Sequence, residues 1–261
     1  MNRIIAIAHN TFREAVRNKI LYSLLFFAIV LIISALALGE LTLGEQVRLT
    51  RDLGLYGIDM FGVLIAIFLG VNLLYKELSL KTIYTILPKP IHRFEFVTGK
   101  WLGMLVTLAI QIAVMGAVLY LALYLQGAEP EVQTAKAIFL LYLNVMVITS
   151  IALVFSSFSS PFLSGIFAIG VFIVGRSIAD LQMIGDRAGG TTKTVIDASI
   201  HVIPNLQLFF PSGTIVGAER VTVNGAFVNA EYLTNASVYG VGYSLVALFV
   251  AIIIFSRRDF V

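Results

Sequence analysis

The sequence contains no cysteine, only three histidines and few charged residues. Without cysteine, a disulfide framework, a thiolate metal site and a cysteine nucleophile are all excluded. His9, His92 and His201 lie far apart and form no ligand-spaced cluster, so zinc chemistry is not expected. Charged residues make up 13% of the chain and hydrophobic residues 59%, whereas soluble domains have about a quarter and about half. The composition predicts an integral membrane protein.

Several catalytic motifs are also absent. The chain has no GxxxxGK[ST] motif for nucleotide binding, and no HExxH or GxSxG motif of a hydrolase. Its apolar runs have few polar residues, with Gln111 and Asn144 near span centres and Asp59 and Arg176 near span ends. These make a poor proton relay. We expect Gln111 and Asn144 to form hydrogen bonds between helices, and we do not expect an intramembrane enzyme.

Six apolar runs are each long enough to cross a bilayer. They cover residues 20–38, 54–75, 101–125, 137–156, 161–179 and 236–255. The first run has a rival interpretation as a signal peptide, because Ala35-Leu36-Ala37 resembles a cleavage site, but the run is longer than such peptides need. We therefore expect an all-α integral membrane protein with six transmembrane helices in a single domain over residues 1–261.

The N-terminal segment, residues 1–19, is predicted to be an amphipathic helix. One face carries Ile5, Ala8, Phe12 and Val16, and another carries His9, Arg13 and Arg17. Such a helix is typical of the headgroup layer of a membrane, where its basic face attracts anionic lipids. The alternative is a solvated helix that merely precedes the first span.

The polar stretch 76–100 is the longest basic segment between two spans. It contains Lys76, Lys81, Lys89, Arg93 and Lys100 against only Glu77 and Glu95. Within it, Leu80, Ile83, Tyr84 and Leu87 have the spacing of one helical face, which predicts a short helix over 78–87 that ends before Pro88 and Pro90. A helix this short is not stable alone, so its apolar face must be covered by this protein, by lipid or by a partner.

The distribution of basic residues predicts the orientation in the membrane. The N-terminal segment, the stretch 76–100 and the C-terminus together hold 11 of the 18 Lys and Arg residues but only 4 of the 15 acids, a net charge of +7. The remainder of the chain, with 7 bases and 11 acids, has a net charge of −4. Because basic segments stay inside, both termini and the stretch 76–100 are expected in the cytoplasm.

The longest outer segment is expected at residues 180–235, between the fifth and sixth spans. It is predicted to contain a short amphipathic or re-entrant helix that closes at Pro204. The LFFP sequence, 208–211, is expected to dip into the membrane interface. The segment 221–228 places Asn224-Gly225 between alternating apolar residues, which is typical of a type I′ β-hairpin.

Glycines recur in the third and fifth spans. Gly99 and Gly103 form a GxxxG pair at the start of the third, whereas Gly165, Gly170 and Gly175 recur every five residues in the fifth. Both patterns suit close approach of another helix, with ordinary packing as the default interpretation.

Together these features resemble the permease subunits of ABC-2 type exporters. The resemblance lies in the N-terminal NTFREAVRNKILYSLL sequence, the six spans, the basic KELSLKTIYTILPKPIHRFEFVTGKWLG sequence after the second span and the long outer loop. Within this family, the chain most resembles the branch that includes the permeases of nitrous oxide reductase maturation and of gliding motility. The likeness covers essentially the whole chain.

The resemblance implies several roles. The helix at 78–87 would be the coupling helix that docks on a separate cytoplasmic ABC ATPase, which would bind ATP and Mg, whereas this chain would have no cofactor. Its anchors would be Leu80, Ile83, Tyr84 and Leu87, with Glu77 and Lys81 as rim charges. The first segment would be the elbow helix, where Phe12, Arg13, Val16 and Arg17 meet the interface.

Further partners and a location also follow from the resemblance. Two copies, or one copy and a sister permease, would form the translocation path in the bacterial cytoplasmic (inner) membrane. Membrane lipids are expected partners and nucleic acid is not. An alternative function is a non-transporting membrane scaffold or sensor that recruits another cytoplasmic partner through the same loop.

Overall fold

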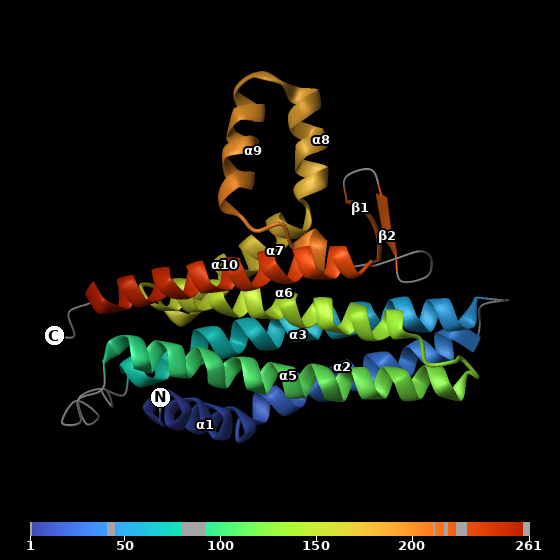
Figure 1. Cartoon of the computed structure of the whole chain (residues 1–261), viewed down its shortest axis with the longest axis horizontal. Coiled ribbons are helices and arrows are strands. Elements are labelled where there is room, and N and C mark those ends of the chain that lie inside the picture. The colour runs from blue at the N-terminus through green and yellow to red at the C-terminus, as the bar shows by residue number, and fades with distance from the viewer. Residues whose placement is uncertain are drawn as a thin grey trace.

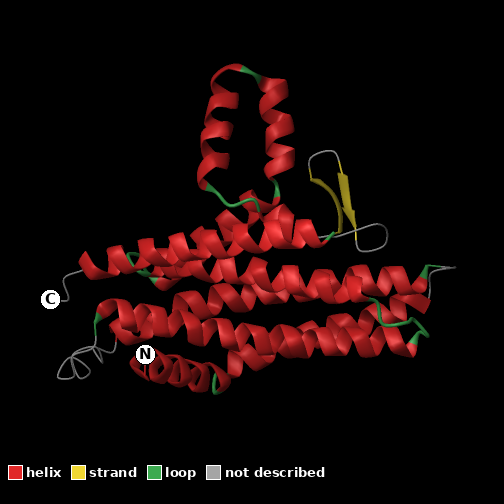
Figure 2. Cartoon of the chain, viewed as in Figure 1, coloured by secondary structure: helices red, strands yellow, loops and turns green. Residues whose placement is uncertain are grey.

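The computed structural model describes residues 2–40, 45–79, 92–210, 212–216, 219–222 and 229–257. Most of these residues are helical, and the long helices lie along one common axis (Figures 1 and 2). The helices are α1 (Asn2–Val16), α2 (Lys19–Glu40), α3 (Gln46–Ser79), α5 (Arg93–Leu125), α6 (Val132–Ser156), α7 (Pro161–Arg176), α8 (Ile178–Ala188), α9 (Gly190–Val202), the 3₁₀ helix η1 (Leu206–Phe209) and α10 (Ala230–Arg257). A two-stranded sheet, β1 (Ser212–Val216) and β2 (Glu219–Thr222), precedes α10.

Five of the described helices are long and apolar enough to cross a membrane: α2, α3, α5, α6 and α10. A sixth span results if α7 and α8 are counted together, although the chain bends by 69° between them. The predicted all-helical membrane fold is therefore confirmed.

The fifth predicted span, residues 161–179, extends past the end of its helix. Helix α7 begins at Pro161, a residue that suits a helix start because its missing N–H would be unpaired there, and ends at Arg176. The Arg176 carbonyl accepts a hydrogen bond from the Gln207 side chain at 2.8 Å, which helps to hold this end in place. Beyond it, α8 and α9 form a helical hairpin that stands away from the bundle (Figure 1), and of these two helices the sequence predicted only the one that closes at Pro204.

The second predicted span, 54–75, lies within a longer helix, because α3 begins at Gln46. Polar residues in its first turns find partners on other elements. Arg51 is only 5% exposed and pairs with Glu131 at 2.8 Å. The Thr50 hydroxyl donates to the Ala35 carbonyl at 3.2 Å and accepts from Gln126 at 2.9 Å. These contacts satisfy polar groups that hydropathy alone assigned to a loop.

The segment between α7 and α10 contains more structure than the sequence predicted. The helix expected to close at Pro204 is α9, which ends at Val202. In the LFFP segment, Phe209 and Phe210 are buried within the protein, and its position relative to the membrane interface stays a prediction. Strand β2 pairs antiparallel with β1, with Thr214 opposite Val221. The predicted turn at Asn224-Gly225 lies outside the described residues, and the described pairing of β2 is with the strand before it.

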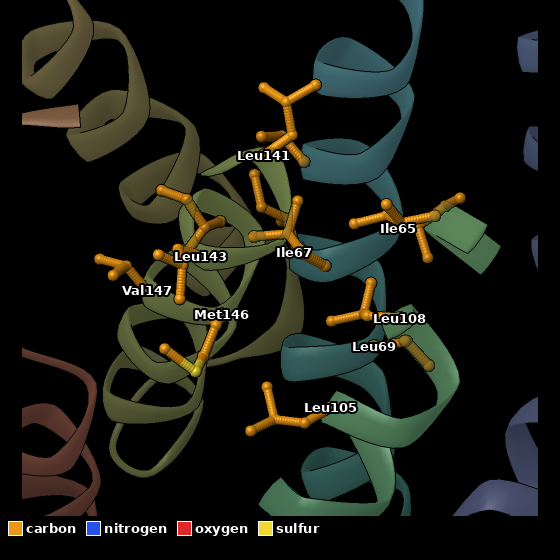
Figure 3. Close-up of a cluster of buried hydrophobic side chains, with 14 of the residues drawn as sticks. Ile65, Ile67, Leu69, Leu105, Leu108, Leu141, Leu143, Met146 and Val147 are labelled. Carbon is orange, nitrogen blue, oxygen red and sulfur yellow. The ribbon is translucent and has the colours of Figure 1, made fainter. Parts of the chain in front are cut away.

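Helices α3 and α6 form the centre of the bundle. In the most apolar part of each of these helices about 72% of the residues are buried, against 22% for α2 and 33% for α10. Figure 3 labels some of the buried apolar side chains that α3, α5 and α6 contribute to the core. They are Ile65, Ile67 and Leu69 from α3, Leu105 and Leu108 from α5, and Leu141, Leu143, Met146 and Val147 from α6.

Candidate functional site

One end of the bundle gathers the segments that the sequence assigns to the cytoplasm. Helix α3 ends and α5 begins there, and α1 begins and α10 ends on the same side (Figure 1). The Arg93 guanidinium donates to the Ser256 carbonyl at 2.8 Å, and the rings of Phe96 and Phe255 stack with centroids 6.0 Å apart. The first turn of α5 is therefore tied to the last turn of α10.

The predicted coupling helix falls almost wholly outside the described residues. Five of the six residues predicted to contact an ATPase lie there: Leu80, Lys81, Ile83, Tyr84 and Leu87. The sixth, Glu77, belongs to the last turns of α3. Helix α5 begins at Arg93. The backbone N–H of the preceding residue, His92, donates to the Glu95 carboxylate at 3.0 Å, which fixes the start of this helix. The helix 78–87 therefore remains a prediction.

Helix α1 has three distinct faces rather than the two expected. Its buried face contains Thr11 and Ala15, both fully buried, with Ile4, Ile7 and Ala8 partly buried beside them. Because successive residues turn by about 100° around a helix, the predicted apolar face of Ile5, Phe12 and Val16 lies beside this one. There Ile5 is 60% and Val16 41% exposed, and Phe12 is partly buried. A third, exposed face carries His9, Arg13 and Arg17, the last just beyond the end of α1.

Two glycines of α5 form a notch that receives the buried face of α1. A Cβ on Gly99 would lie 2.7 Å from the Ile7 Cβ and 3.0 Å from the Ile4 carbonyl oxygen. A Cβ on Gly103 would lie 2.6 Å from both the Ala8 carbonyl oxygen and the Thr11 Cβ. The glycine notch, Gly99 and Gly103, thus lets two helix backbones approach closely. The sequence revealed the pair but not its partner.

Charged residues surround this notch. The Lys100 ammonium lies 3.3 Å from the Glu14 carboxylate and 5.8 Å from the centre of the Phe96 ring. Lys100 is only 1% exposed. One turn earlier, Arg3 lies 3.9 Å from Glu95. Helices α1 and α5 are therefore joined by charge as well as by shape.

A second buried polar group lies between α3, α6 and α7. We call Asp59, Asn144 and Arg176 the Asp59 cluster. The Asn144 amide donates to one Asp59 oxygen at 2.7 Å, and the Arg176 guanidinium bonds the other. Asp59 is 2% exposed and Asn144 fully buried. The predicted hydrogen bond of Asn144 between helices is confirmed, whereas the Gln111 side-chain oxygen has no partner among the described residues.

Arg176 also joins the bend of the broken span to the segment after α9. Its guanidinium carbon lies 3.7 Å from the centre of the Phe210 ring, a cation–π geometry. The Phe210 ring in turn meets the Tyr56 ring edge to face, with centroids 6.5 Å apart. Because Asp59 and Arg176 are far apart in sequence, hydropathy located each one near a span end but gave no sign of their pairing.

The hairpin of α8 and α9 carries an exposed ion pair. Its exposed Lys193 and Asp186 form an ion pair at 2.8 Å, which raises the pKa of Lys193. Within the described ranges, no three His, Asp or Glu side chains are close enough together to hold a metal ion.

Comparison with known proteins assigns the chain to a class of membrane transport proteins. The family described as ABC-2 family transporter protein matches residues 5–260, which is nearly the whole chain. The chain therefore belongs to this family, whose members are membrane permease components rather than catalytic subunits. A comparison with curated protein sequences found no match.

The Asp59 cluster allows a test of how much the buried ion pair stabilises the fold. Replacing Arg176 with Met leaves the Asp59 charge buried without its cation, which should cost about 3 kcal/mol of stability. The double variant Asp59→Asn/Arg176→Met removes both charges and should recover most of this loss. Thermal unfolding of the purified protein in detergent measures the difference, and an unchanged Tm for Arg176→Met would contradict the role of the pair.

The glycine notch makes a prediction with a matched control. Gly103→Ala should destabilise the protein by about 1 to 3 kcal/mol, because the new methyl group overlaps the backbone of α1. Gly242→Ala in α10 should be neutral or stabilising, since nothing lies within 4 Å of its Cβ position and alanine favours a helix. The melting temperature in detergent should fall for Gly103→Ala and should stay unchanged or rise for the control variant. Equal destabilisation would show that α1 does not pack in the notch.

Proposed function

We propose that this chain is the membrane-spanning subunit of an ATP-driven exporter, coupled to a separate cytoplasmic ABC ATPase through the helix predicted at 78–87. Membership of the ABC-2 transporter family is the observation that carries the proposal. The ATPase would bind ATP and Mg, because this chain lacks the phosphate-binding motif. Export rather than import, and kinship with the nitrous oxide reductase and gliding-motility branch, are proposed from the likeness to ABC-2 exporters.

The arrangement of one bundle end supports this coupling. Helix α3 ends and α5 begins at the bundle end where α1 begins and α10 ends, so one surface would be available to a single partner (Figure 1). In the proposed orientation this surface faces the cytoplasm of a bacterium, where both termini would lie. An apolar helix face rimmed by Glu77 and Lys81 would dock in a groove of the ATPase.

A second permease copy, or a sister permease, would complete the path. Helix α7 buries only Ser164, Ala168 and Gly175, so most of its surface is open. Its open side includes Phe162, 80% exposed, and Ile173, 57% exposed. Gly170 on the same helix has nothing within 4 Å of its Cβ position, a feature that suits close approach of another helix.

Helix α1 would lie in the cytoplasmic headgroup layer. Its three faces support this position, because the buried face contacts α5, Ile5 and Val16 would meet acyl chains, and Arg13 and Arg17 would meet anionic headgroups. A solvated helix would have no need of the exposed apolar side chains.

Binding of the ATPase tests the proposal. Affinity purification of the tagged chain from its own host should recover an ABC ATPase with a Walker motif, identified by mass spectrometry. The variant Ile83→Asp/Tyr84→Asp should abolish this recovery, because two charges would enter the apolar face. Thr85→Asp, on the opposite side of the predicted helix, should leave it intact.

Two outcomes would decide against the proposal. If no ATPase is recovered and another cytoplasmic protein is found instead, the scaffold or sensor alternative would be favoured. If the ATPase is recovered equally with Ile83→Asp/Tyr84→Asp, the helix at 78–87 is not the coupling element.

A further inference from the structure

The contact between α1 and α5 is more extensive than anchoring a helix at a membrane surface requires. It combines the glycine notch with two ion pairs, one of which buries a lysine almost completely. A buried ion pair is costly to desolvate and strongly destabilising to break, so it holds its two helices in one relative position. A surface anchor needs only an apolar face and basic residues, both of which α1 already has on its other sides.

The partner helix gives this contact its meaning. Helix α5 is the helix that directly follows the stretch 80–91, and Gly99, Lys100 and Gly103 lie within its first three turns. Any displacement of that stretch along or across the bundle therefore reaches the notch through a continuous, hydrogen-bonded helix. Close-packed helices transmit such displacement because they cannot deform to absorb it.

The other end of α1 continues the connection. Only Arg17 and Asn18 separate α1 from α2, and their backbone N–H groups bond back to the carbonyls of Glu14 and Ala15 at 3.2 and 2.9 Å. The Asn18 side chain accepts from the Ile20 N–H at 3.0 Å, which caps α2. The link is thus short and ordered, and α2 is the least buried of the five helices that are each long enough to cross a membrane.

We propose that α1 and the first three turns of α5 form one rigid arm. This arm carries movement of the segment that precedes α5 to the headgroup layer and on to α2. Gly99 and Gly103, together with the Lys100–Glu14 ion pair, are the positioning residues of this arm. The inference rests on the proposed function, because the movement would originate from the ATPase. It adds that the N-terminal helix transmits the movement instead of serving as a passive anchor.

Distance measurements between spin labels test the arm directly, because the chain has no cysteine and labels can be attached at introduced cysteines. Three exposed positions serve, Asn10 on α1, Phe94 on α5 and Val132 at the far end of the central helix α6. The sample is the complex with its recovered ATPase in lipid nanodiscs, nucleotide-free or trapped with ADP and vanadate. The distances are measured by pulsed electron paramagnetic resonance.

A rigid arm predicts a specific pattern. The Asn10–Phe94 distance should stay constant between the two nucleotide states, while Asn10–Val132 and Phe94–Val132 change together. The variant Glu14→Gln keeps the shape of the side chain but removes its charge. In this variant the change in the Phe94–Val132 distance between the two nucleotide states should persist, and the change in the Asn10–Val132 distance should fall at least twofold. The charge swap Glu14→Lys/Lys100→Glu should restore it. Glu45→Gln, which breaks the exposed pair with Arg48 on the other side of the bundle, should have no effect.

The outcomes separate the two proposals. A wild-type Asn10–Phe94 distance that changes with nucleotide, or a Glu14→Gln protein that keeps the full movement at Asn10, would overturn the arm while leaving ATPase coupling intact. If Glu14→Gln does not fold, the wild-type and charge-swap distances decide the same question. Failure of any ATPase to bind would overturn the proposed function and the arm with it.

Discussion

The absence of water from the bilayer core is the constraint on which the structure depends. Backbone and side-chain polar groups in the spans must find partners inside the protein, because lipid offers none. Hydroxyl groups in the helices do this locally, as when Thr149 donates to the Val145 carbonyl at 2.6 Å. Where a side chain reaches a neighbouring helix, it joins the two. The Trp101 indole donates to the Ser150 hydroxyl at 2.8 Å and so connects α5 to α6.

The same constraint explains where charges occur inside the bundle. Asp59 has Arg176 and Asn144 as partners, and Lys100 has Glu14, each from another helix. Every such pair holds two helices in one relative position, because separating the partners would leave a charge buried in apolar surroundings. The Asp59 cluster holds the bend of the broken span to the centre of the bundle. The ion pair between Lys100 and Glu14 holds α1 to α5.

The sequence was sufficient to predict the class of fold and most spans, because hydropathy reports length and burial in lipid directly. It was less successful where tertiary partners extend or interrupt a helix. Helix α3 starts early because Arg51 meets Glu131, and α7 stops at Arg176 within a set of contacts from Gln207 and Asp59. Neither partner is near in sequence. The GxxxG pair at Gly99 was recognised as a packing signal, but only the structure shows that it receives α1.

Coupling to a cytoplasmic ATPase requires the basic stretch 76–100 to face the cytoplasm. A single cysteine introduced at Thr85, in an otherwise cysteine-free chain, can be tested with a membrane-impermeant maleimide in intact and permeabilised cells. Asn229→Cys, just before α10 at the opposite end of the bundle, provides the comparison. We predict that Asn229→Cys is labelled in intact cells and Thr85→Cys only after permeabilisation. Labelling of Thr85→Cys from outside would contradict coupling to a cytoplasmic ATPase.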